Sequence, residues 1–118
     1  MDFMFRRLKV YQLAIGLAAS LESDCKLIRT KGNYPMSDQI RRAAMSVPIN
    51  IAEGNGRSTN ADKRRFFIIA RGSCFELASL LELAEKFEYV TSERRNCHES
   101  RMTEIGKMLT ALANSLKG

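Results

Sequence analysis

The chain has few of the residues that most often carry chemistry or cross-link small proteins. Among its 118 residues it has 0 Trp, 1 His, 2 Pro and 3 Cys. The cysteines, Cys25, Cys74 and Cys97, are odd in number and widely spaced, and two of them fall inside apolar helical patterns. This pattern argues against a disulfide framework or a zinc site and favours reduced thiols packed as small apolar side chains. His98 has no second ligand pair near it, so we expect an exposed surface residue rather than a metal ligand.

Long apolar runs are also missing. No stretch of about 18 apolar residues suits a transmembrane helix, and the residues that follow Met1 lack the order of a signal peptide. We therefore expect a soluble, cytoplasmic protein. With 45% apolar and 27% charged residues, the composition indicates one globular domain over residues 1–118.

The apolar residues recur with a helical period in four segments, and no useful length of sequence alternates as a strand does. We expect helices over about 5–29, from about Ser37 or Asp38 to 53, over 60–86, and from about 92 onward. Connections this short imply antiparallel neighbours, which predicts an all-α, antiparallel up-down-up-down four-helix bundle. Pro48 lies inside the second pattern, where it predicts a kink, with a complete break as the alternative.

The apolar surface is wider than one small bundle needs. The first helix is apolar around much of its circumference, and the third shows a second seam that is polar only at its centre. The positions on the first helix are Leu8, Val10, Tyr11, Leu13, Ala14, Ile15, Leu17, Ala18 and Leu21. The second seam is Phe66, Ile69, Ser73, Glu76, Leu80, Leu83 and Phe87. Part of this surface is expected to meet another subunit, although it could instead enlarge the internal core.

Charge is unevenly placed in this topology. Lys and Arg number 19 against 13 Asp and Glu, a formal net charge of +6. The excess falls at the end where helices 1 and 3 start and helices 2 and 4 finish. We expect this end to contact phosphates of RNA or DNA, although a solvated basic end without a ligand is the alternative. No aromatic residue is expected in the basic clusters to stack on bases. The predicted contact residues are Arg6, Arg7, Arg57, Lys63, Arg64 and Arg65.

Polar residues interrupt the helical patterns at a few positions. We expect five of them to form a structural polar network inside the bundle, in which Glu76 or Glu53 pairs with Arg42, Arg57 or Arg71, since buried carboxylates need partners. Gly72 would let another backbone approach closely. The expected network is Arg42, Asn50, Glu53, Arg71 and Glu76.

No known catalytic arrangement is visible in the sequence. There is no Glu-x-x-His pair of a di-iron bundle, no Gly-rich phosphate loop and no nucleophile with a placeable base. We therefore expect a protein that is not an enzyme, with no catalytic residues, no metal and no cofactor.

Three segments together resemble a known family. They are residues 5–14 (FRRLKVYQLA), 39–57 (QIRRAAMSVPINIAEGNGR) and 66–77 (FFIIARGSCFEL). The chain is similar to the bacterial four-helix-bundle proteins first noted as open reading frames in intervening sequences of large-subunit ribosomal RNA. The resemblance implies a homopentameric ring. It also implies a link to nucleic acid, because a similar protein is the accessory factor of diversity-generating retroelements and binds a reverse transcriptase and nucleic acid.

Two functions remain open from the sequence. The first is an oligomeric accessory protein that binds RNA or DNA through its basic end. The second is a protein-interaction scaffold whose ring docks a partner protein, such as a reverse transcriptase, and whose basic end steers the approach or keeps the protein in solution.

Overall fold

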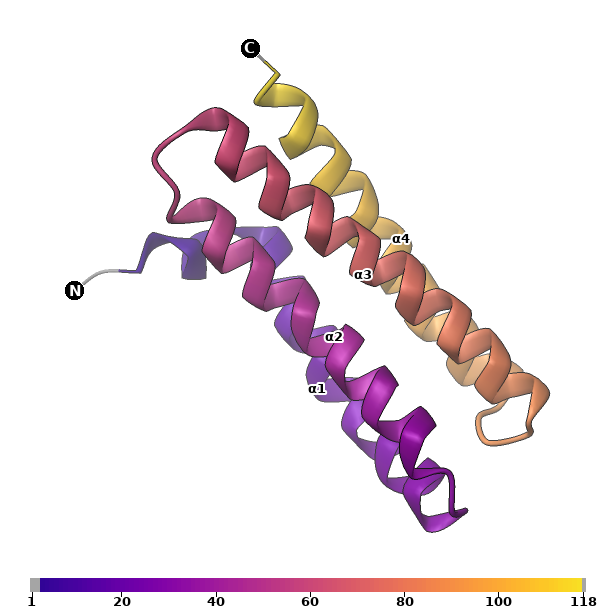
Figure 1. Ribbon diagram of the computed structural model, residues 1–118. Coiled ribbons are helices and arrows are strands. Elements are labelled where there is room, and N and C mark those ends of the chain that lie inside the picture. The colour runs from indigo at the N-terminus through magenta and orange to yellow at the C-terminus, as the bar shows by residue number, and fades with distance from the viewer. Residues whose placement is uncertain (1–2, 118) are drawn as a thin grey trace.

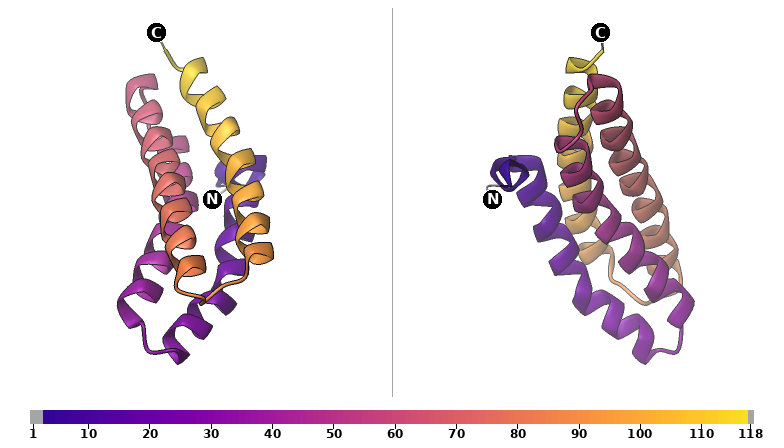
Figure 2. Two further views of the ribbon diagram at one scale, coloured as in Figure 1. Left: turned by 90° about the vertical axis from the view of Figure 1, so that its right-hand side faces the viewer. Right: turned by 60° about the vertical axis from the view of Figure 1, so that its left-hand side comes forward.

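The computed structural model describes residues 3–117, which form four α-helices preceded by a short 3-10 helix (Figure 1). Consecutive α-helices run antiparallel and pack side by side, so the predicted up-down four-helix bundle is confirmed (Figures 1 and 2). The elements are η1 (Met4–Arg7), α1 (Lys9–Thr30), α2 (Tyr34–Asn55), α3 (Asn60–Lys86) and α4 (Ser92–Ser115).

The helix starts follow from local capping. Helix α3 begins as predicted, because the Thr59 side chain accepts a hydrogen bond from the Asp62 amide at 3.1 Å. Helix α2 begins earlier than predicted, because Asn33 rather than Ser37 or Asp38 caps it. Pro35 fits in its first turn, where no helical acceptor exists for an amide.

Ser37 has a different role from the predicted cap. It is 1% exposed, and its hydroxyl donates to the Cys25 carbonyl at 2.9 Å, which ties α2 to α1. Farther along, α2 continues through the buried Pro48, so the alternative of a complete break at that residue is wrong.

The core lies along the axis of the bundle and draws on all four helices. Its largest fully buried side chains are leucines and isoleucines, each of which stabilises the fold by roughly 1.5 to 3 kcal/mol through burial. They are Leu17, Leu21, Ile28, Ile40, Ile51, Leu77, Leu81, Ile105 and Leu109.

Gly54 sets how closely α2 approaches α3. A Cβ atom at this position would lie 2.9 Å from the Phe67 ring, 3.0 Å from the Phe66 Cβ and 3.1 Å from the Lys63 carbonyl oxygen. The predicted close approach at Gly72 is wrong among residues 3–117, since none of them, apart from the surrounding turns of α3 itself, lies within 4 Å of a Cβ placed there. Gly54 is therefore the residue that brings the end of α2 against the start of α3.

Several large apolar side chains remain exposed, including much of the second seam predicted on α3. The core therefore does not absorb the whole apolar surface of the chain. These side chains include Ile15 on α1, Met45 and Ile49 on α2, and Ile69, Phe75, Leu83 and Phe87 on α3 and at its end.

Candidate nucleic-acid interface

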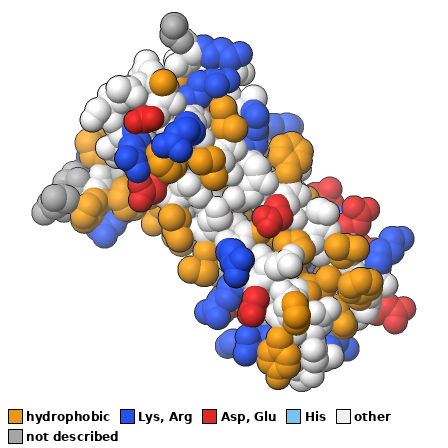
Figure 3. Space-filling view, in the orientation of Figure 1, with side chains coloured by type: hydrophobic (Ala, Val, Ile, Leu, Met, Phe, Trp, Pro, Cys, Tyr) orange, Lys and Arg blue, Asp and Glu red, His pale blue; other side chains and the backbone are white. Residues whose placement is uncertain are grey.

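The up-down topology brings the starts of α1 and α3 and the ends of α2 and α4 to one half of the molecule (Figures 1 and 2). Lys and Arg side chains gather where α2 ends and α3 begins, whereas acidic and basic side chains mix at the opposite end (Figure 3). The 3-10 helix η1 packs against α1 and α2 in the same half. We call this surface the basic end and define it as Arg6, Arg7, Arg57, Lys63, Arg64 and Arg65.

Arg57 and Arg65 are the two basic side chains at the α2–α3 turn that are most open to solvent. Their side chains are 42% and 59% exposed. Arg57 donates one hydrogen bond to Glu53 at 3.0 Å, whereas Arg65 Nε lies 3.9 Å from Asp62, beyond hydrogen-bond distance. Since a guanidinium has five N–H donors, both side chains keep donors for a ligand.

One aromatic ring contacts both of these side chains. The guanidinium carbons of Arg57 and Arg65 lie 4.6 and 4.5 Å from the centroid of the Phe66 ring. The prediction that no aromatic residue lies in the basic clusters is therefore wrong. Phe66 adjoins Arg65 in the sequence, but only the close α2–α3 approach at Gly54 brings Arg57 to the same ring.

Lys63 and Arg64 are less exposed than Arg57 and Arg65. Lys63 Nζ donates to the Asn55 carbonyl at 3.2 Å, at the end of α2. Arg64 is half-buried and lines a groove with Leu116 and Lys117, so the end of α4 adds a further lysine beside the basic end. Arg64 Nε is buried without a hydrogen-bond partner among residues 3–117.

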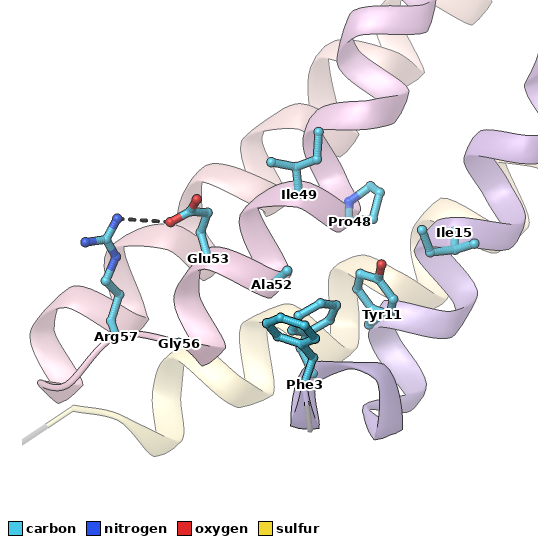
Figure 4. A pocket seen from close by; sticks show the side chains of 10 residues that line it. Phe3, Tyr11, Ile15, Pro48, Ile49, Ala52, Glu53, Gly56 and Arg57 are labelled. Atoms are coloured by element: carbon cyan, nitrogen blue, oxygen red, sulfur yellow. Dashed lines mark hydrogen bonds and ion pairs between the residues drawn. The ribbon is translucent and has the colours of Figure 1, made fainter. Parts of the chain in front are cut away.

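A second group of aromatic side chains lies beside the basic end, in a groove of about 580 Å³ between η1, α1 and α2 (Figure 4). Phe5 packs edge-on against Tyr11 with ring centroids 4.9 Å apart, and the Arg6 guanidinium lies 5.3 Å from the Phe3 ring centroid. The Glu53–Arg57 ion pair lies on the α2 side of this groove, away from Phe3 and Tyr11 (Figure 4).

The five residues expected to form a polar network do not come together as one. Glu53 pairs with Arg57, as predicted, but this pair is exposed. Arg42 and Glu76 are exposed, and neither makes an ion pair with any residue of the described part of the chain.

The other two members of the expected network hold helices together at separate places. Arg71 donates to the Thr110 hydroxyl at 3.2 Å, joining α3 to α4. Asn50 donates to the Ser46 hydroxyl at 2.9 Å, and this hydroxyl lies 2.7 Å from that of Ser73, joining α2 to α3.

A buried polar cluster that was not predicted lies in the other half of the bundle. His98 is 3% exposed, so the prediction of a surface histidine is wrong, and its Nε2 lies 2.9 Å from Asp24 Oδ2. Arg94 donates to both carboxylate oxygens of Asp24, at 2.7 and 2.8 Å. Burial alone would raise the pKa of Asp24, but the hydrogen bonds from Arg94 and His98 outweigh it and lower the pKa to about 2.

The sequence carried one signal for this cluster. Asp24 follows Leu17 and Leu21 and precedes Ile28 on the stripe that packs into the core. An acidic residue on such a stripe needs a partner, but its partners lie about seventy residues away and could not be named without the fold.

The cysteines are free thiols, as predicted. Cys25 and Cys74 are buried and Cys97 is exposed. Burial raises the pKa of the Cys74 thiol to about 11 and also raises that of Cys25.

Within residues 3–117, no group of three or more His, Cys, Asp or Glu side chains is placed to hold a metal ion. None of the described helices has the length and hydropathy needed to span a membrane.

Comparison with known proteins agrees with the fold and with the sequence motifs. The family model described as 23S rRNA-intervening sequence protein matches residues 6–111, and the chain belongs to this family. A crystal structure of a protein with unknown function from the S23 ribosomal protein family of Bacteroides thetaiotaomicron is similar, with a TM-score of 0.83 and 28% sequence identity. The match covers 88% of this chain and 97% of that one. Comparison with curated proteins finds no match.

Proposed function

We propose that the protein is a non-enzymatic accessory factor that binds RNA or DNA through its basic end. The observation that carries this proposal is the placement of charge. Arg57, Lys63, Arg64 and Arg65 crowd the α2–α3 turn, and among the described residues the acidic side chains near them are Glu53 and Asp62. Such a surface favours a polyanion, because each neutralised phosphate releases a counterion.

The six residues of the basic end have two roles: some contact phosphates directly, and the others contribute to the electrostatic potential that attracts the ligand. Arg57 and Arg65 are exposed and keep unused donors, so they are the phosphate contacts. Arg6 and Arg7 extend the surface from η1. Lys63 donates to the Asn55 carbonyl, and Arg64 is half-buried in a groove beside the end of α4. Both contribute positive potential that steers the ligand.

Charge reversal tests the proposal with a matched control. The test variant is Arg57→Glu with Arg65→Glu, and the control is Lys26→Glu with Arg101→Glu. Both change the net charge by the same amount, but Lys26 and Arg101 are exposed residues in the other half of the bundle. Fluorescence anisotropy of a labelled RNA or DNA strand is expected to show an affinity loss of about a hundredfold or more for the first variant. The control is expected to bind nearly as well as the wild type. Equal affinities for the two variants would contradict the assignment of the basic end.

We also propose that the protein assembles with copies of itself, as the pentameric ring implied by the family resemblance would require. The exposed Ile15, Met45 and Ile49 support this, since Ile15 and Ile49 line one surface groove and Met45 and Ile49 line another. Assembly would multiply the basic ends available to one strand and raise its affinity. Light scattering at micromolar concentration is expected to give several times the 13.3 kDa mass of the chain. A monomer mass would contradict this.

A docking scaffold for a partner protein, such as a reverse transcriptase, is the second candidate function. Phe75 is 72% exposed beside a groove of about 570 Å³ between α3 and α4, which supports a protein partner. A partner recovered from nuclease-treated lysate by the wild type, but not by a Phe75→Ser variant, would favour this function. Loss of nucleic-acid binding in the Arg57→Glu, Arg65→Glu variant would favour the first.

A further inference from the structure

We propose that Arg57, Phe66 and Arg65 form a stacking platform for an unpaired nucleobase, so that the basic end recognises single-stranded nucleic acid by base faces as well as phosphates. This inference rests on the proposed nucleic-acid function and specifies what the site binds. The cluster lies at the α2–α3 turn, between the last turn of α2 and the second turn of α3.

Two cations converge on one aromatic ring at this place. The guanidinium carbons of Arg57 and Arg65 lie 4.6 and 4.5 Å from the Phe66 centroid, so their separation is no greater than these two distances together. The ring attracts each guanidinium, and this attraction opposes the repulsion between the two like charges. Gly54 makes the arrangement sterically feasible, because any larger residue there would push Phe66 and α3 away from α2.

A guanidinium offers two surfaces to a nucleotide. Its edges donate hydrogen bonds to phosphate oxygens, and its flat faces stack on bases. Arg57 uses one donor on Glu53, and Arg65 uses none on any residue between 3 and 117. Both side chains are more than two-fifths exposed, so a strand at this turn meets edges for its phosphates and faces for its bases.

The ring also prepares the site for binding. A long arginine side chain loses conformational entropy when it is fixed on a ligand. Contact with Phe66 already restricts Arg57 and Arg65 before any ligand arrives. Lysine at the same positions would keep the charge but would present no planar face to a base.

The experiment compares two single strands of DNA with equal length and charge. One is an oligothymidine, and the other is the same backbone built from abasic residues. Anisotropy with the wild-type protein is expected to show about tenfold tighter binding of the base-bearing strand, since a stacked base adds affinity that an abasic residue cannot.

Two variants then locate the preference on the platform. Phe66→Leu is expected to reduce the preference for bases to about twofold or less while leaving affinity for the abasic strand nearly unchanged. Arg57→Lys with Arg65→Lys is expected to reduce the same ratio of affinities, whatever it does to binding of the abasic strand, because lysine keeps the charge but has no planar face. The control is Arg42→Lys with Arg101→Lys, two exposed positions in the rest of the bundle, which should keep the full preference. Urea unfolding of each variant confirms that it is folded before it is compared.

The results distinguish base stacking on the platform from phosphate binding by the basic end. Equal wild-type affinity for the two strands would overturn the platform and leave phosphate binding intact. A preference that survives in both variants would overturn it as well, because the base would then be bound elsewhere. Absence of binding to both strands at low salt would overturn the platform together with the proposed function.

Discussion

Asp24 in α1 accepts two hydrogen bonds from Arg94 at the start of α4, at 2.7 and 2.8 Å, and so ties the first helix of the bundle to the last. The carboxylate is 2% exposed, and His98 contacts it from the same face of α4. This ion pair lies in the half of the bundle opposite the basic end. It holds α1 against α4, two helices that no loop connects directly.

Removal of the carboxylate should destabilise the fold. Asp24→Ala would leave His98 buried without its partner, and we expect the free energy of unfolding to fall by about 2 to 4 kcal/mol in urea titrations. Asp38→Ala is the matched control, because Asp38 pairs with Arg29 at the surface. That control is expected to cost about 1 kcal/mol or less. If the two variants lost similar free energies of unfolding, the buried Asp24–Arg94 ion pair would contribute no more to stability than a surface pair.

The same carboxyl should make stability depend on pH in the acid range. Its pKa is lowered in the folded protein to about 2, so it stabilises the fold above its unfolded value of about 4 and stops doing so as the pH falls towards 2. The stability difference between the wild type and Asp24→Asn should therefore shrink by about 2 kcal/mol between pH 6 and pH 2.5. Urea unfolding at both pH values measures this difference, and a constant difference would contradict the assignment.

Two glycine substitutions should act in opposite directions. Gly54→Ala places a methyl group against Phe67, Phe66 and the Lys63 carbonyl, so we expect a loss of about 1 to 3 kcal/mol. Gly72→Ala meets nothing within 4 Å, so its higher helix propensity should give a gain of about 0.5 to 1 kcal/mol. Thermal or urea unfolding compares the two variants. A loss at Gly72 would instead indicate close packing against another copy of the chain.

Thiol reactivity should report burial directly. Cys97 is exposed, whereas Cys25 and Cys74 are buried and have raised pKa values. A thiol reagent at neutral pH should modify one cysteine quickly in the native protein and all three after denaturation. Cys97→Ser should abolish the fast phase. Fast modification of a second thiol would contradict the packing of α1 or α3.

The helices and their order could be predicted from the sequence because local signals determine them. Apolar periodicity defines each helix, and the Thr59 cap places the start of α3 at the predicted residue. The predicted start of α2 is too late, because Asn33, Ser37 and Asp38 can all cap a helix. Asn33 accepts from the Met36 amide, whereas Ser37 is buried and donates to the Cys25 carbonyl.

The side-chain contacts of the candidate site were less predictable, because they depend on which helix faces meet. Periodicity could not show that Glu76 is exposed to solvent, or that His98 would contact Asp24 from the other end of the chain. The gathering of basic residues at one end followed from topology alone. The contact of Arg57 with Phe66 required the close approach at Gly54.

The salt dependence of strand binding tests the central claim most directly. Anisotropy of a labelled single strand, measured between about 50 and 200 mM salt, gives the number of phosphates that the protein neutralises. If the basic end binds phosphates, affinity should fall by an order of magnitude or more over this range, and Arg65→Ala should make the slope shallower by about 0.7. Affinity that does not change with salt, or no binding at the lowest salt, would contradict the account.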